Sequence, residues 1–112
     1  MRPALPRFDQ PLVLEAPERA EDGGGGHSTI WRRVALHWAE IRPVTARETV
    51  EGAALVIGVS HRIRVRAVPR NSFLWPEPAR RLRLEDRVFD ILGVAEEGDA
   101  VLRIWAREGG TP

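Results

Sequence analysis

The sequence lacks both cysteine and lysine among its 112 residues. Without cysteine, the chain can form neither a disulfide nor a thiolate metal site. Because lysine is missing, all 17 basic side chains are arginines. A GC-rich genome favours this usage, and arginine forks also suit carboxylate and phosphate contacts at interfaces. The formal net charge is only +1, so no overall field draws the chain to nucleic acid or acidic lipid.

Long hydrophobic runs are missing as well. No apolar stretch approaches the ~20 residues that a membrane span needs. The first residues also lack the charged segment and apolar run of a secretory signal. We therefore expect no membrane partner, and a protein that acts in the cytoplasm or in something assembled there.

Motifs for catalysis, metals and cofactors are missing too. The GGGGHS segment has no lysine and precedes a predicted strand, so it is a hairpin loop rather than a phosphate loop. The histidines, His27, His37 and His61, lie on separate predicted elements without the spacing of a zinc site. Two acidic pairs fall in predicted turns, where solvation explains them. We expect no catalytic residue, no metal and no cofactor, and hence no enzyme.

What the sequence does contain is alternation of apolar and polar residues between turn signals, which predicts an all-β domain. We expect a small closed or partly open antiparallel β-barrel with one short helix in a connecting segment. The predicted strands cover residues 11–16, 28–41, 59–67, 81–84, 88–95 and 100–107, and a glycine-rich loop makes the first two a hairpin. The predicted organisation is an extended arm at 1–10, one barrel domain at 11–107 and a disordered tail at 108–112.

The helix is predicted from a capping box and an apolar stripe. Thr45 and Glu48 have the spacing at which their side chains satisfy free backbone amides reciprocally. The stripe has helical spacing and consists of Val50, Ala53, Ala54 and Ile57. We expect the helix to end near Gly58.

The long strand at 28–41 carries Ile30, Val34, Leu36 and Trp38 on one face, and Arg33, His37 and Ala39 on the other. Three features invite functional interpretation: an arginine row, the apolar helix stripe, which packing across the barrel end would also explain, and an aromatic loop. The strand SHRIRVRAV exposes the row Arg62, Arg64 and Arg66. Three interpretations of this row stay open: a solvated face with cross-strand carboxylates, a set of phosphate contacts, or ion pairs between subunits. The loop between two prolines holds Phe73, Leu74 and Trp75, which form a satellite core or a partner anchor.

Three segments occur in a fixed order along the chain: WAEIRPVTARE at 38–48, SHRIRVR at 60–66 and RVFDIL at 87–92. In this order and spacing they resemble the head-to-tail joining proteins of tailed bacteriophages, over roughly residues 10–107. Two departures stand out. The turn before RVFDI usually reads Asp-Gly but is Glu85-Asp86 here, and the loop at 69–80 is longer and more aromatic than expected.

The resemblance implies a β-barrel that forms a ring, a hexamer in the family, beneath the portal of a virion. Such stopper or head-completion proteins dock on an adaptor ring after DNA packaging, retain the double-stranded DNA and offer a platform to the tail. The implied partners are copies of the chain, an adaptor on the portal side, a tail terminator or other tail protein, and DNA in the lumen. The implied location is the neck of a phage or gene transfer agent, assembled in the bacterial host cytoplasm.

Carried over by position, the segment that lies towards the channel and acts as a plug is residues 45–58. The residues singled out in it are Thr45, Arg47, Glu48, Val50, Glu51 and Ala54. We expect its polar edge, Arg47, Glu48 and Glu51, to lie nearer the lumen than Val50 and Ile57. For Arg62, Arg64 and Arg66 we expect inter-subunit ion pairs first and phosphate contacts second.

Two other functions remain open. A tail terminator is also a ring at this joint. A small barrel that binds single-stranded nucleic acid would use basic and aromatic side chains together on one sheet face, although the near-neutral net charge favours the connector.

Overall fold

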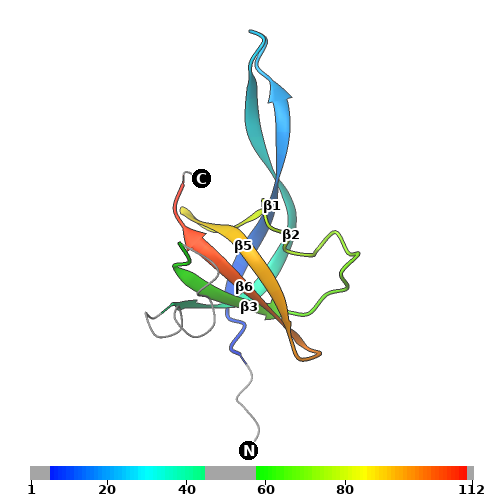
Figure 1. Ribbon diagram of the computed structural model, residues 1–112, viewed down its shortest axis with the longest axis vertical. Helices are drawn as coiled ribbons and strands as arrows, with labels where there is room; N and C mark the ends of the chain where they lie inside the picture. The colour runs from blue at the N-terminus through cyan, green and yellow to red at the C-terminus, as the bar shows by residue number, and fades with distance from the viewer. Residues whose placement is uncertain (1–5, 45–57, 111–112) are drawn as a thin grey trace, which may run out of the picture.

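The computed structural model describes residues 6–44 and 58–110 as an antiparallel β structure (Figure 1). Its strands are β1 (Gln10–Glu21), β2 (His27–Pro43), β3 (His61–Arg66), β4 (Arg81–Leu84), β5 (Arg87–Glu97) and β6 (Val101–Glu108). The described residues contain no helix. The predicted helix and plug segment at 45–58 lie outside the described residues, apart from Gly58.

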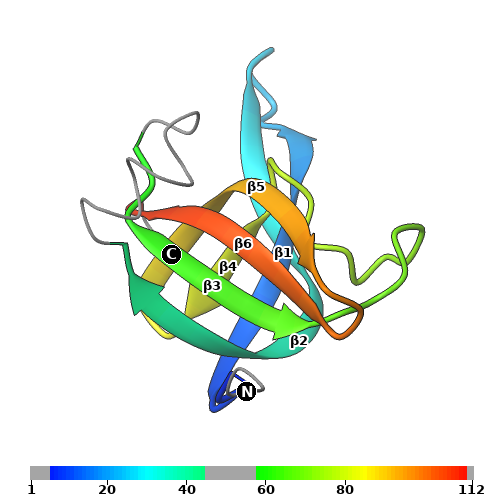
Figure 2. The same ribbon diagram turned by 60° about the horizontal axis from the view of Figure 1, so that its bottom comes forward.

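The strands close into a barrel in the order β1-β2-β3-β6-β5-β4, in which β4 pairs back onto β1 (Figure 2). Every pairing is antiparallel. The predicted all-β antiparallel barrel is therefore confirmed. Closure satisfies the backbone groups around the wall without leaving a sheet edge there.

Alternating side chains from every strand fill the barrel. In β3, for example, Ile63 and Val65 are fully buried, whereas the arginines that alternate with them lie on the outer wall. The core consists of Leu12, Leu14, Ala39, Ile63, Val65, Leu82, Phe89, Ile91, Leu102, Ile104 and Ala106. Burial of this apolar surface is the main favourable contribution to folding.

The β1–β2 hairpin is longer than the sequence predicts and projects from the barrel, at the top of Figure 1. The strands continue to Glu21 and His27, and only residues 22–26 form the turn. Asp22 holds this turn, since its Oδ1 accepts hydrogen bonds from the Gly24 and Gly26 backbone N–H groups at 2.9 and 3.0 Å. The chain therefore measures 60 Å along its longest axis but only 28 and 25 Å across.

A β-bulge lies where the hairpin leaves the barrel. Leu14 pairs with Ala35 and Glu15 with Arg33, so Val34 has no opposite partner on β1. One extra residue interrupts the alternation of a strand. The even-numbered residues of β2 before the bulge therefore lie on the opposite side of the sheet from the even-numbered residues after it. The apolar face predicted for residues 30–38 is therefore split between two sides of the sheet.

Candidate functional site

The predicted arginine row lies on the outer wall of the barrel, on β3. Arg64 is held between two carboxylates: Nε and Nη2 donate to Glu40 Oε1 at 2.9 and 2.7 Å, and Nη1 donates to Glu97 Oε2 at 2.9 Å. Arg103 Nε also donates to Glu97, at 2.7 Å. Together these side chains form a chain of ion pairs across β2, β3, β6 and β5. Cross-strand carboxylate pairing, one of the three interpretations of the row, is thus present for Arg64.

Both carboxylates of this chain favour the ionised form. Burial raises the pKa of Glu40, but hydrogen bonds from the Arg64 side chain and the Arg7 backbone outweigh it, and the net pKa lies below its usual value. Burial likewise raises the pKa of Glu97, and hydrogen bonds from Arg103 and Arg64 again bring it below the usual value. The ion pairs therefore persist well below neutral pH.

The other two arginines of the row have different surroundings. The Arg66 guanidinium stacks over the Phe8 ring, 4.9 Å from its centroid, and so attaches the N-terminal arm to the barrel. Arg62 lies opposite Arg42 on β2, and its buried Nε has no hydrogen-bond partner among residues 6–44 and 58–110. An inter-subunit or phosphate contact for the row stays a prediction.

The loop between Val68 and Arg81 is folded and carries one exposed aromatic ring. Trp75 packs against the core and Phe73 is 66% exposed. Arg80 Nη1 fixes the backbone between them by donating to Phe73 O at 2.8 Å and to Trp75 O at 3.1 Å. The satellite-core interpretation fits Trp75, and the partner-anchor interpretation is left to Phe73.

His37 fastens this loop to the barrel. Its Nε2 donates to Leu74 O at 2.8 Å, and its side chain is buried on the same side of β2 as Ala39. Burial lowers the pKa of His37, and the hydrogen bond to Leu74 opposes this only in part. The neutral ring is thus the form that the fold accommodates.

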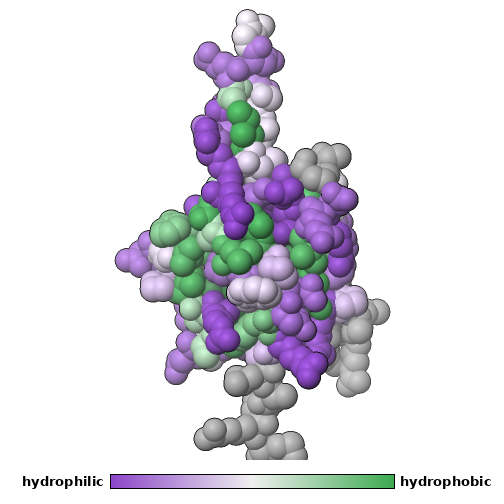
Figure 3. All heavy atoms as spheres, turned by 180° about the vertical axis from the view of Figure 1, so that it is seen from behind, coloured by the Kyte–Doolittle hydropathy of each residue, from purple (hydrophilic) through white to green (hydrophobic). Residues whose placement is uncertain are grey.

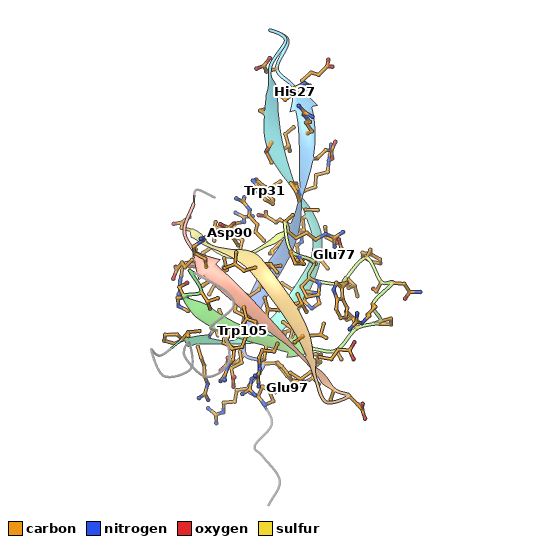
Figure 4. All side chains as sticks on the ribbon, viewed as in Figure 1. His27, Trp31, Glu77, Asp90, Glu97 and Trp105 are labelled. Carbon is orange, nitrogen blue, oxygen red and sulfur yellow. The ribbon has the colours of Figure 1, made fainter. Side chains whose placement is uncertain are left out.

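A buried ion pair braces the base of the projecting hairpin, where Figure 4 places Trp31. Arg81 Nε donates to Glu15 Oε1 at 2.7 Å, and both side chains are 6% exposed. The Arg81 guanidinium also stacks 4.1 Å from the centroid of the Trp31 ring, and Arg83 Nε lies 3.2 Å from Glu15. We did not predict this brace, although a glutamate inside the apolar run PLVLEA was a signal that could have revealed it.

The bulge leaves apolar side chains exposed on both sides of the β1–β2 ribbon. In the barrel, Leu36 and Trp38 lie opposite Val13 and Pro11 and point outward; they are 44% and 51% exposed. Past the bulge, Ile30 lies opposite Glu18, on the side that continues the barrel interior, and is 46% exposed. Figure 3 shows hydrophobic surface on the barrel below the hairpin.

Ser60, His61 and Glu108 meet where β3 begins and β6 ends. Ser60 Oγ shares a hydrogen bond with His61 Nδ1 at 2.9 Å and accepts one from the Glu108 backbone N–H at 2.7 Å. His61 Nε2 lies 3.7 Å from Glu108 Oε1, and Glu108 is held by Arg87 at 2.8 Å. Because the serine hydroxyl is committed to both neighbouring strands, we interpret the cluster as a tie between β3 and β6.

Within the described ranges, no group of three or more histidine or acidic side chains is placed to hold a metal ion. Among the same residues, no helix is long and apolar enough to cross a membrane. The predicted plug residues, Thr45, Arg47, Glu48, Val50, Glu51 and Ala54, are not among the described residues.

Comparisons with known proteins agree with the barrel and its sequence motifs. No curated protein matches the chain. A chain in the virion of a native gene transfer agent particle is 32% identical with a TM-score of 0.63, and the match covers 99% of this chain and 100% of that one. A Shigella flexneri 2a protein, known from a solution structure, is 23% identical with a TM-score of 0.64, over 92% and 94% of the two chains, and it supports the fold. The phage head completion protein family matches residues 4–109. The chain therefore belongs to the phage head completion protein family, whose members are structural virion proteins.

Proposed function

We propose that this head-completion protein forms a ring in the neck of a phage-like particle, between the portal adaptor and the tail. The ring retains packaged double-stranded DNA and gives the tail its docking platform. The observation that carries this proposal is the similarity, over nearly the whole of both chains, to a chain of a gene transfer agent virion. The family match over residues 4–109 supports the same position in the particle.

The shape of the molecule suits such a role. A closed barrel with a filled core resists deformation, because its wall has paired strands and its interior is packed. A rigid wedge of this kind can repeat around a symmetry axis and use one interface many times. The projecting hairpin and the Phe73 loop then supply contacts beyond the wedge.

We assign different tasks to the predicted sites. Phe73, on its braced loop, docks on the adaptor or on a tail protein, since an exposed aromatic ring on a fixed backbone makes an effective anchor. Residues 45–58, with Thr45, Arg47, Glu48, Val50, Glu51 and Ala54, face the lumen and hold the DNA. Arg62 and Arg66 contact a neighbouring subunit or, transiently, phosphate, whereas Arg64 is already engaged within its own chain.

Deletion of the gene, followed by electron microscopy of the lysate, tests the proposal. We expect DNA-leaking or empty heads beside separate tails, and restoration of tailed particles by the wild-type gene in trans. Normal, infectious particles would refute the proposal. Filled heads that carry tails of irregular length would instead identify a tail terminator.

A second experiment separates the docking loop from the barrel. Phe73→Ala should leave the chain folded, because the ring is 66% exposed, but should lower the yield of tailed particles. Trp75→Ala is the contrasting variant, because it removes a side chain packed on the core and should destabilise the fold as well. Normal tailing with Phe73→Ala would contradict the docking role of this residue.

A further inference from the structure

The two apolar faces of the β1–β2 ribbon lie on opposite sides of the sheet. We propose that the projecting hairpin of one copy packs on the outer wall of the next copy, with Ile30 of the first over Trp38 of the second. This assignment rests on the ring proposed above and names the surfaces that build it. The contact is head-to-tail, because the donor surface and the acceptor surface are different parts of the chain.

The two surfaces differ in the size of their side chains. On the hairpin, Ile30 lies on the same side as the small side chains of Ala16 and Ala20 and beside the exposed ion pair of Glu18 and Arg32. On the outer wall, Leu36 and Trp38 are bulky and about half exposed. Large side chains on one face set against small ones on the other allow close packing of two sheets.

Their placement on opposite sides of one ribbon decides which type of contact forms. In the proposed contact, one neighbour covers the face of Ile30 and a second neighbour covers the face of Leu36 and Trp38. Each copy therefore needs two neighbours, and a contact that repeats in this way closes into a ring when the rotation allows it. The β-bulge at Val34 creates this arrangement, because without it the two faces would be on the same side.

Charge follows the same spacing on both surfaces. Four residues past Glu18, the partner of Ile30, the exposed Asp22 lies at the tip of the hairpin. Four residues past Trp38, β2 reaches Arg42, whose side chain is 62% exposed. Four residues of strand span about 13 Å. When Ile30 of one copy lies over Trp38 of the next, and β1 of the first copy runs parallel to β2 of the second, the acidic tip of the hairpin reaches Arg42.

The hairpin is long enough and stiff enough for this contact. Its β1 strand runs six residues past Glu15, the last residue that pairs with β4, which is about 20 Å and close to the 25 Å width of the molecule. The buried pair of Glu15 and Arg81 fixes its base. An isolated two-stranded ribbon is marginally stable in water, so a neighbour that covers Ile30 would also stabilise the hairpin.

Introduced cysteines test the contact directly, because the chain has none of its own. The test variant carries Ala16→Cys and Leu36→Cys, which the proposed alignment sets against each other in neighbouring copies. The control variant carries Ala16→Cys and Ala95→Cys; Ala95 is exposed on the outer wall of β5. Each replaces the wild-type gene in the particle, and purified particles are treated with a short bismaleimide cross-linker and analysed by denaturing electrophoresis and immunoblotting.

We expect a ladder of cross-linked copies with the test variant and none with the control. If the chain is present in the particles but the test variant gives no ladder, or links to a different protein of the particle, the assignment is wrong while the proposed function stands. If wild-type particles do not contain the chain, the assignment and the proposed function fail together.

Discussion

The same two strands, β1 and β2, build two regions with opposite physical character. Their barrel halves pair with β4 and β3 as well as with each other and bury Leu12, Leu14 and Ala39. Their projecting halves pair only with each other, and both sides of that ribbon face solvent. The barrel is therefore stabilised by its own core, whereas the hairpin depends on its brace and, in our proposal, on a neighbour. Mutations should affect folding in the first region and assembly in the second.

The largest effect is expected from the barrel core. Phe89→Ala removes a fully buried ring and should lower the free energy of unfolding by about 3–5 kcal/mol, measured by urea denaturation. Ile30→Ala, in the hairpin, is the matched truncation and should cost less than about 1 kcal/mol. Equal losses for the two variants would remove the distinction between the regions.

Two glutamates on β1 compare the brace with the free ribbon. Glu15→Ala removes a buried carboxylate that pairs with the Arg81 guanidinium and should cost about 3 kcal/mol. Glu18 pairs with Arg32 on the exposed part of the hairpin, so Glu18→Ala should cost about 0–1 kcal/mol. Thermal or urea unfolding of both variants gives the comparison. A small loss for Glu15→Ala would mean that the brace is dispensable.

Acid should weaken the barrel through the buried ring of His37. Burial holds the pKa of His37 below its ordinary value of 6.5, so the unfolded state binds more protons as pH falls through that value. The free energy of unfolding should thus decrease between about pH 7.5 and about pH 5.5. His37→Gln should reduce this decrease. His27→Gln, at the exposed tip, is the control and should leave it unchanged.

The smallest effects are expected in the turn of the hairpin. Gly23 has φ of +83°, which disfavours any side chain, so Gly23→Ala should cost about 1 kcal/mol. Gly24 has no such φ, and an added Cβ would meet Asp22 Oδ1 at an ordinary 3.6 Å. Gly24→Ala should therefore change the free energy of unfolding by less than about 0.5 kcal/mol. Because the turn is remote from the barrel, hydrogen exchange of its amides is the most sensitive measurement.

The sequence predicts the barrel better than the hairpin, and the reason is physical. Alternation in β3 and β6 reflects a buried inner face, so residues such as Ile63 and Ile104 reveal their strands directly. The bulge at Val34 depends on which β2 residue pairs with Leu14, and the sequence of neither strand alone determines that pairing. The same holds for the brace, because Glu15 and Arg81 are far apart in sequence and adjacent only after the barrel closes.

The functional residues divide in the same way. The row at Arg64 was recognised as basic and outward-facing, but its engagement with Glu40 and Glu97 required the order of four strands. Phe73 and Trp75 were grouped by their position between prolines, and only the fold separates the exposed ring from the packed one.

The bulge also has a consequence for how this protein can diverge. An insertion of one residue between Leu14 and Glu15 would give Val34 an opposite partner and turn every hairpin side chain beyond it to the other side of the sheet, while the pairs up to Leu14 and Ala35 kept their register. A change of one codon in length could thus redirect the hairpin to a different neighbour without a single substitution in the core. If the hairpin contacts a neighbour as we propose, insertions at this position, rather than amino-acid replacements, offer related chains the shortest route to different subunit contacts.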